Sequence, residues 1–170
     1  MTFQVGEKVV YPNHGVGTIE NISSRAFGTQ SERFYLLRLS PNRMTVMVPF
    51  SHVGDVGLRK VTKVSEINRV LTYLSAGRSC CSAQDWKDRF KENSDKMKGG
   101  SLLEIAEVFK ALVMIQMSKP LSFREKKMLE RSRSMLILET SVARSVPEPE
   151  AINLITKALA KCGLPMPAAL

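Results

Sequence analysis

The chain has 170 residues, of which 44% are hydrophobic and 24% are charged. These fractions are typical of globular proteins and exclude a chain that is disordered throughout. The formal net charge of +9 favours a polyanionic partner, either nucleic acid or an anionic membrane surface, with plain solubility as the competing interpretation.

The start of the chain predicts no export. Residues 2–6 contain neither a basic segment nor an apolar run, so no signal peptide is expected. The most apolar stretch, 102–117, is interrupted by charged residues and is too short to span a bilayer. We therefore expect a soluble, cytoplasmic protein.

The first sixty residues have the pattern of short β-strands. Turn-forming residues such as Pro, Gly, Asn and Ser separate the β-prone runs, which predicts a small curled sheet or barrel. The expected strands are Lys8–Tyr11, Val16–Ile22, Phe34–Leu39 and Met44–Val48.

The rest of the chain has helical periodicity. The expected helices are Val64–Leu74, Ser82–Met97, one from Ser101 to Pro120, one from Ser122 to about Ser145, and Ala151–Lys161. The predicted fold class is therefore α+β with two domains: a small β-barrel over 1–61 and an all-α domain of about five helices over 65–162. Residues 163–170, with Pro165 and Pro167, are expected to form a frayed tail.

Two helix starts carry a capping box, in which a Ser cap is followed three residues later by Glu. The pairs are Ser101 with Glu104 and Ser122 with Glu125. The helix that begins at Ser101 is apolar on almost every side, which predicts a position at the centre of the helical domain.

No constellation of catalytic or metal-binding residues is recognisable. The two histidines, His14 and His52, fall in expected loops, and Cys80, Cys81 and Cys162 match no zinc spacing. We therefore expect no enzyme activity, metal or cofactor. A small enzyme that uses Cys80 or Cys81 is the remote alternative.

The fourth helix carries a basic stripe. Its cations fall within one half of the helical wheel, and its apolar side chains fall on the other. Such a helix packs on a core and faces either a phosphate backbone or plain solvent, and the pattern fits both interpretations. The cations are Arg124, Lys126, Lys127, Arg131 and Arg133.

The second helix contains the only tryptophan of the chain. Trp86 shares a face with Phe90, and Lys87, Arg89 and Lys91 flank that face. Trp86 either packs into the helical core or stays exposed, in which case it can wedge against or stack on a nucleobase while the cations contact phosphates.

Several segments resemble the CarD/CdnL family of bacterial transcription regulators. The resemblance covers about residues 1–160, and the N-terminal fold is shared with the polymerase-binding module of transcription-repair coupling factors. The segments that carry it are Phe3–Gly17, Met44–Pro49, Val56–Arg59, Trp86–Lys91 and Leu121–Leu129.

The resemblance implies a Tudor-like, SH3-like domain over 1–61 that binds the β subunit of RNA polymerase, with Arg25, Thr45 and Met47 at the contact. It also implies that the helical domain contacts the minor groove of promoter DNA at the upstream edge of the bubble, largely without sequence preference. Trp86 would act as the wedge, and the implied DNA-facing cations are Arg89, Lys91, Lys126 and Lys127. Lys87 and Arg131 join this set from the patterns above.

The family pattern implies a monomer that stabilises the open promoter complex. Two positions depart from it: some members have arginine at Met47 and a basic residue at Asp88. Two alternatives stay open. One is a polymerase-binding adaptor without DNA contact, whose helical half serves another protein. The other is a free-standing relative of the repair-coupling module that recruits a helicase-type partner.

Overall fold

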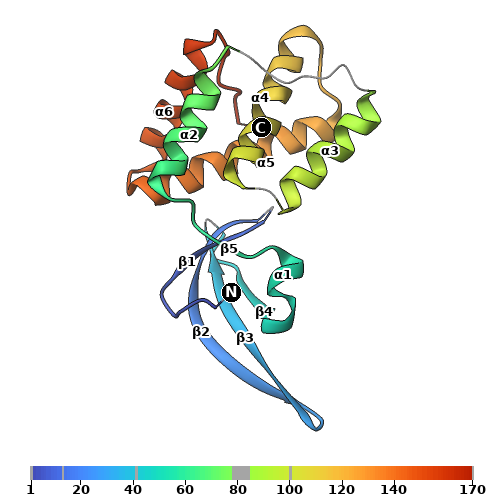
Figure 1. The fold of residues 1–170 in the computed structure, drawn as a ribbon, viewed down its shortest axis with the longest axis vertical. Helices are drawn as coiled ribbons and strands as arrows, with labels where there is room; N and C mark the ends of the chain where they lie inside the picture. The colour runs from blue at the N-terminus through green and yellow to red at the C-terminus, as the bar shows by residue number, and fades with distance from the viewer. Residues whose placement is uncertain (1, 13, 41, 78–84, 100, 170) are drawn as a thin grey trace. The chain divides into compact units, whose positions relative to one another are not determined.

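The computed structural model describes residues 2–12, 14–40, 42–77, 85–99 and 101–169. It divides into two compact units, Met1–Val61 and Thr62–Leu170. The first unit is built around a β-sheet and the second contains helices (Figure 1). The chain is therefore an α+β protein, as the change of pattern near residue 61 predicts.

The N-terminal unit is an antiparallel sheet of five strands with the order β4-β3-β2-β1-β5. A 3-10 helix, Phe50–His52, and the short helix α1, Val53–Val56, connect β4 to β5. β4 and β5 therefore form the two edges of the sheet. The strands are β1 Lys8–Tyr11, β2 Gly15–Phe27, β3 Gln30–Leu39, β4 Thr45–Pro49 and β5 Arg59–Lys60.

The hairpin of β2 and β3 is longer than the sequence predicts. We expected the second strand to stop before Ser23-Ser24, but β2 continues to Phe27 and pairs with β3 down to Gln30. Gly28 has a φ of +63° in the tight turn between them, a conformation that favours glycine. The distal half of the hairpin extends away from the rest of the unit as a two-stranded ribbon (Figure 1).

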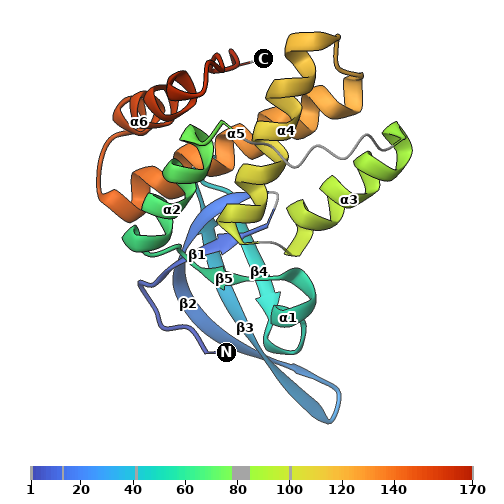
Figure 2. The ribbon, with the colours of Figure 1, turned by 45° about the horizontal axis from the view of Figure 1, so that its top comes forward.

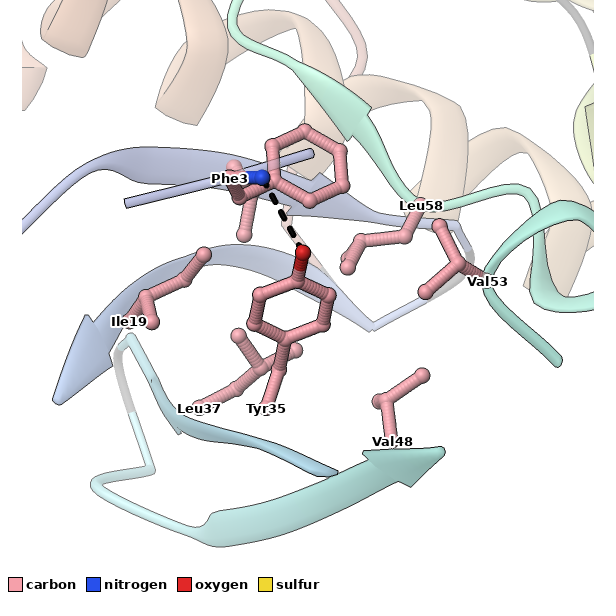
Figure 3. Packing of buried hydrophobic residues seen from close by; sticks show 8 residues of the cluster. Phe3, Ile19, Tyr35, Leu37, Val48, Val53 and Leu58 are labelled. Atoms are coloured by element: carbon pink, nitrogen blue, oxygen red, sulfur yellow. Dashed lines mark hydrogen bonds between the residues drawn. The ribbon is translucent and has the colours of Figure 1, made fainter. Parts of the chain in front are cut away.

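Tyr35 lies at the centre of the core of this unit. Its ring stacks on Phe50, with 4.2 Å between ring centroids. Its hydroxyl accepts a hydrogen bond of 3.1 Å from the Phe3 backbone N–H (Figure 3). The hydroxyl therefore holds the chain start over the sheet, where Phe3 is buried. The core cluster consists of Phe3, Val9, Ile19, Tyr35, Leu37, Val48, Val53 and Leu58.

The second unit contains five helices among its described residues, and α2 and α6 lie side by side in it (Figures 1 and 2). Their bounds are α2 Val64–Ser75, α3 Trp86–Gly99, α4 Leu102–Ser118, α5 Phe123–Arg144 and α6 Glu148–Lys161. The expected start of α3 at Ser82 involves residues 82–84, which lie outside the described residues.

Helix α4 is the central helix, as its all-round apolar pattern predicts. It packs against α2, α3 and α5. Buried side chains lie on more than one of its faces: Leu102, Ile105, Ala106, Val108, Phe109, Lys110, Leu112 and Val113.

Two buried charged side chains make hydrogen bonds between separate segments of this unit. The Lys110 ammonium donates to the backbone carbonyls of Tyr73, at 2.8 Å, and of Ala76. It thereby satisfies carbonyls at the C-terminal end of α2, where a cation is also favoured by the helix dipole. The Glu139 carboxylate, on α5, accepts hydrogen bonds from the Thr62 backbone N–H, at 2.9 Å, and from the Thr62 hydroxyl.

The C-terminal segment differs from the expectation in two respects. Helix α6 begins at Glu148 rather than Ala151, because Pro149 is tolerated in the first turn, where a backbone N–H needs no helical partner. The tail is not frayed throughout: Leu164 is buried, and Arg133 Nε on α5 donates a 3.1 Å hydrogen bond to the Pro167 carbonyl.

Candidate nucleic-acid and polymerase interfaces

The first turns of α3 and α5 meet through an ion pair. Arg89 on α3 donates from Nη2, at 2.7 Å, and from Nε, at 3.3 Å, to Oε1 of Glu125 on α5. The side chains of Arg89 and Glu125 are only 18% and 9% exposed. Next to this pair, the Arg124 guanidinium lies 6.0 Å from the centre of the Phe90 ring. The two helices that the sequence singles out for DNA contact therefore adjoin at their N-terminal turns.

Glu125 also belongs to the capping box of α5. Its backbone N–H donates to Ser122 Oγ, and its Oε2 accepts from the Ser122 backbone N–H at 3.2 Å. The capping box of Ser101 and Glu104 at the start of α4 is formed in the same way. Both predicted capping boxes are thus confirmed.

Five of the cations predicted for DNA contact are exposed in the helical unit. The basic stripe of α5 lies opposite its buried residues, which include Leu129, Ser132 and Met135. The exposed cations are Lys87 and Lys91 on α3 and Lys126, Lys127 and Arg131 on α5. Arg89 differs from them, because Glu125 engages its guanidinium. Arg133, half-buried, contacts the C-terminal tail instead.

Trp86 is the first residue of α3. Its side chain lies outside what the structure describes, so its predicted role as a wedge stays a prediction. Its position in the helix places it one turn from Arg89, on the end of α3 that adjoins α5.

Phe123 is an aromatic residue of this surface that the sequence patterns did not single out. It is the first residue of α5 and is 72% exposed. Lys127 lies one turn later, with its ammonium 4.6 Å from the centre of the Phe123 ring. Its position immediately after the Ser122 cap could have indicated exposure, because side chains in the first turn of a helix often lie in solvent.

The ionisation of Glu125 makes the junction of α3 and α5 sensitive to pH. Burial raises the pKa of this carboxyl, but hydrogen bonds from Arg89 and Ser122 outweigh burial and hold the pKa below its usual range. A lowered pKa in the folded state contributes stability above the pKa of the unfolded state, and this stability is lost as pH falls through the folded-state pKa.

We therefore expect the stability difference between the wild type and Glu125→Gln to depend on pH. Urea unfolding should show the wild type to be more stable at pH 7, with the difference shrinking below about pH 4.3, the ordinary pKa of glutamate. Gln at this position keeps the neutral hydrogen bonds of the capping box. A difference that stays constant from pH 7 to pH 3 would contradict the role of the ionised carboxylate.

A second surface lies on the outer face of the N-terminal sheet. Side chains alternate along a strand, and residues directly opposite in an antiparallel ladder share a face. Tyr35 pairs with Val48 and both are buried, so Leu36 and its partner Met47 point to the other face. Along β3, Glu32 lies on the same face as Leu36. Arg25 pairs with Glu32 in the ladder, so its side chain also points to this face.

The three residues predicted for polymerase contact therefore share this outer face. Arg25 lies on β2, and Thr45 and Met47 lie on the edge strand β4. Two apolar side chains of the same face are exposed: Met47 is 36% exposed and Phe27 is 60% exposed. The Phe27 ring covers Phe34, with 6.1 Å between the ring centroids.

The described residues give two findings, on metal-ligand groups and on membrane-spanning helices. Within them, no group of three or more His, Cys, Asp or Glu side chains is arranged to hold a metal ion. No helix in the described part of the chain is both long and apolar enough to cross a bilayer. Cys80 and Cys81 lie outside the described residues, and Cys162 is a free thiol.

The described residues thus form a β-unit with the edge strand β4 and a helical unit with an exposed basic surface. Comparison with family models identifies each part: residues 3–62 match the CarD-like/TRCF RID domain, and residues 69–156 match the CarD C-terminal domain. The chain belongs to the CarD-like family of transcription factors.

The sequence of one relative agrees with this assignment. The chain is 36% identical over 148 residues to the putative transcription factor YdeB of Bacillus subtilis (strain 168), a match that covers 87% of this chain and 96% of the relative. Among solved structures, it is similar to CdnLNt from Myxococcus xanthus, with 41% identity, 36% of this chain and 86% of that chain covered, and a TM-score of 0.31. It is also similar to the solution structure of the N-terminal domain of Myxococcus xanthus CarD, with 36% identity, 35% and 79% coverage, and a TM-score of 0.30.

Proposed function

We propose that the chain is a non-catalytic, monomeric regulator of transcription that stabilises the open promoter complex in the cytoplasm. The N-terminal unit binds the β subunit of RNA polymerase, and the helical unit contacts promoter DNA at the upstream edge of the bubble. The observation that carries the DNA contact is the junction of α3 and α5: α3 begins with Trp86, α5 begins with the exposed Phe123, and both helices carry exposed lysines.

The proposed polymerase contact uses the outer face of β2, β3 and β4. The edge strand β4 offers backbone groups on its free side for strand addition, while Met47 supplies an apolar contact and Arg25 supplies a cation. Because Met47 carries no charge, an acidic surface on the polymerase would be recognised through Arg25.

The proposed DNA contact is a mixture of phosphate and base contacts. Lysines at phosphates give affinity that falls with salt and does not depend on sequence. An aromatic group that fits only unpaired or distorted bases binds the open state better than the closed state, and an equilibrium moves only through such differential affinity. Attachment to polymerase raises the local concentration of the helical unit, so weak DNA binding is sufficient.

The rate at which preformed open complexes dissociate after a competitor challenge tests this function. The chain is expected to slow dissociation by about tenfold, the effect of one aromatic–base contact of about 1–3 kcal/mol. Binding to polymerase without any change in this rate would favour the second candidate, an adaptor without DNA contact. That candidate is favoured by the match of residues 3–62 to a domain type shared with transcription-repair coupling factors.

Phe123 is expected to contribute to the same effect. Phe123→Ala should shorten the lifetime of the open complex in the presence of the protein by about twofold to tenfold, because a stacking or wedging ring is removed. Met117→Ala is the matched control, since Met117 is also an exposed apolar residue, at 59%. Equal effects of the two substitutions would remove Phe123 from the DNA interface.

A further inference from the structure

Helix α3 buries few of its side chains against the helical unit. Among its described side chains, only Asn93 and Met97 are buried. An ion pair at each end supplies further contacts: Arg89 with Glu125 of α5, and Lys96 with Glu107 of α4 at 3.0 Å. The position of the first turn of α3 therefore depends on the pair of Arg89 and Glu125.

Glu125 joins two structural functions through its two oxygens. Oε1 accepts both hydrogen bonds from Arg89, and Oε2 accepts from the backbone and hydroxyl of Ser122. One carboxylate thus caps α5 and at the same time fixes the first turn of α3. Charge-assisted hydrogen bonds of this kind define geometry more strictly than a single neutral bond does.

The state of Arg89 argues against a phosphate contact. The Arg89 side chain is only 18% exposed and its guanidinium is engaged by an ionised carboxylate, whereas Lys87 and Lys91 on the same helix are exposed. Glu125 already engages the Nε and Nη2 groups of this guanidinium, and a phosphate contact through its other N–H groups would bring the DNA backbone next to the Glu125 carboxylate.

We propose that Arg89 is a positioning residue and that it acts on DNA through Glu125. The pair holds the end of α3 that carries Trp86 against the end of α5 that carries Phe123 and Lys127, so that the two helices present one surface. This inference rests on the proposed DNA contact of the helical unit. It reassigns Arg89, which resemblance to the family places among the DNA-facing cations.

The substitution Glu125→Gln separates the two roles because they predict opposite signs. If Arg89 contacts phosphate, removal of its competing carboxylate frees the guanidinium and strengthens binding to DNA. If Arg89 is a positioning residue, the loss of the ion pair loosens the first turn of α3 and weakens binding. Gln retains the capping box at this position, so α5 itself should be preserved.

The measurement is the affinity of the full-length chain for RNA polymerase bound to a fork-junction promoter DNA. Glu125→Gln is expected to lower this affinity by roughly threefold or more, in the range of coupling between residues of one hydrogen-bond network. The control Glu130→Gln, on the same helix, removes one negative charge without touching Arg89 and is expected to leave the affinity unchanged or raise it. An unchanged or raised affinity for Glu125→Gln overturns the proposal.

Hydrogen exchange provides a readout that does not depend on DNA. Glu125→Gln and Arg89→Gln are each expected to increase amide exchange in the first turns of α3 in the free chain, whereas Lys91→Gln is not. Unchanged exchange in both variants would also overturn the proposal. Two further variants, Trp86→Ala and Lys127→Ala, distinguish the two possible failures. If they leave the fork-junction affinity unchanged, as Glu125→Gln also does, the proposed DNA contact has failed. If they lower this affinity and Glu125→Gln does not, only the positioning role of Arg89 is refuted.

Discussion

Replacement of Trp86 by alanine is expected to shorten the lifetime of the open promoter complex, measured in the presence of the protein, by about tenfold. A wedge or stacking contact of about 1–3 kcal/mol is lost, and it is lost only from the open state, where the bases are accessible. The rate of open-complex formation should change much less than the rate of collapse. The measurement is the decay of preformed complexes after a competitor challenge, at saturating protein.

Two controls make this result specific to DNA contact. The Trp86→Ala variant must still bind polymerase, and its unfolding must remain cooperative, since tryptophan also contributes to helical packing in many proteins. Trp86→Phe should recover part of the lifetime, because a smaller aromatic ring retains stacking. A folded, polymerase-binding Trp86→Ala variant with the wild-type lifetime would eliminate the wedge.

Charge reversal at Arg25 is expected to have the largest effect on polymerase binding. Arg25→Glu places a carboxylate on the outer face of the sheet, where it would face the proposed acidic surface of the partner. We expect it to weaken binding by about tenfold or more, because the loss of an interfacial charge pair typically costs about 2 kcal/mol or more of binding free energy. The measurement is the dissociation constant of the chain for RNA polymerase in the absence of DNA.

Arg33 provides a matched control for Arg25. It lies on β3 opposite Ser24, the neighbour of Arg25, so its side chain points to the other face of the same exposed hairpin. Arg33→Glu makes the same change in net charge a few ångströms away and should leave the dissociation constant within about twofold, a difference typical of surface substitutions outside an interface. Equal weakening by both variants would mean that net charge, rather than the outer face, determines binding.

Local chemistry made the helical unit predictable. The Ser–Glu capping boxes mark the starts of α4 and α5, so the predicted starts of these two helices agree with the structure. The apolar pattern of α4 predicted its central position because a helix with no polar face has to be surrounded. The start of α6 lies three residues before the predicted one, because Pro149 disfavours the interior of a helix but is accepted in its first turn.

The sheet was less predictable because backbone pairing, rather than side-chain pattern, forms part of it. The distal end of β2 contains Ser23 and Ser24, which have no apolar alternation, and the hairpin ladder alone continues the strand there. The two residues of β5 form a strand only because β1 lies beside them. Neither feature has a signal within its own short segment.

In the candidate sites too, features set by local pattern were predictable and contacts between distant segments were not. Exposure of the α5 lysines followed from the helical wheel. The partner of Arg89, however, lies 36 residues away on another helix, and nothing in the local pattern of α3 indicates it. Identification of Arg89 as a DNA-facing cation depended on residue type and flanking position, and the ion pair becomes visible only when α3 and α5 are placed together.

The central claim, that one molecule joins polymerase to promoter DNA, is tested most directly by cutting the chain between its two units. A protease site inserted after Val61 leaves both units intact before cleavage, and the decay of open complexes is then compared for the uncut and the cut protein at equal concentration. We expect slow decay with the uncut protein and decay close to that of polymerase alone after cleavage, because the local concentration of the helical unit is lost. Equal protection by the cut and uncut protein would contradict it.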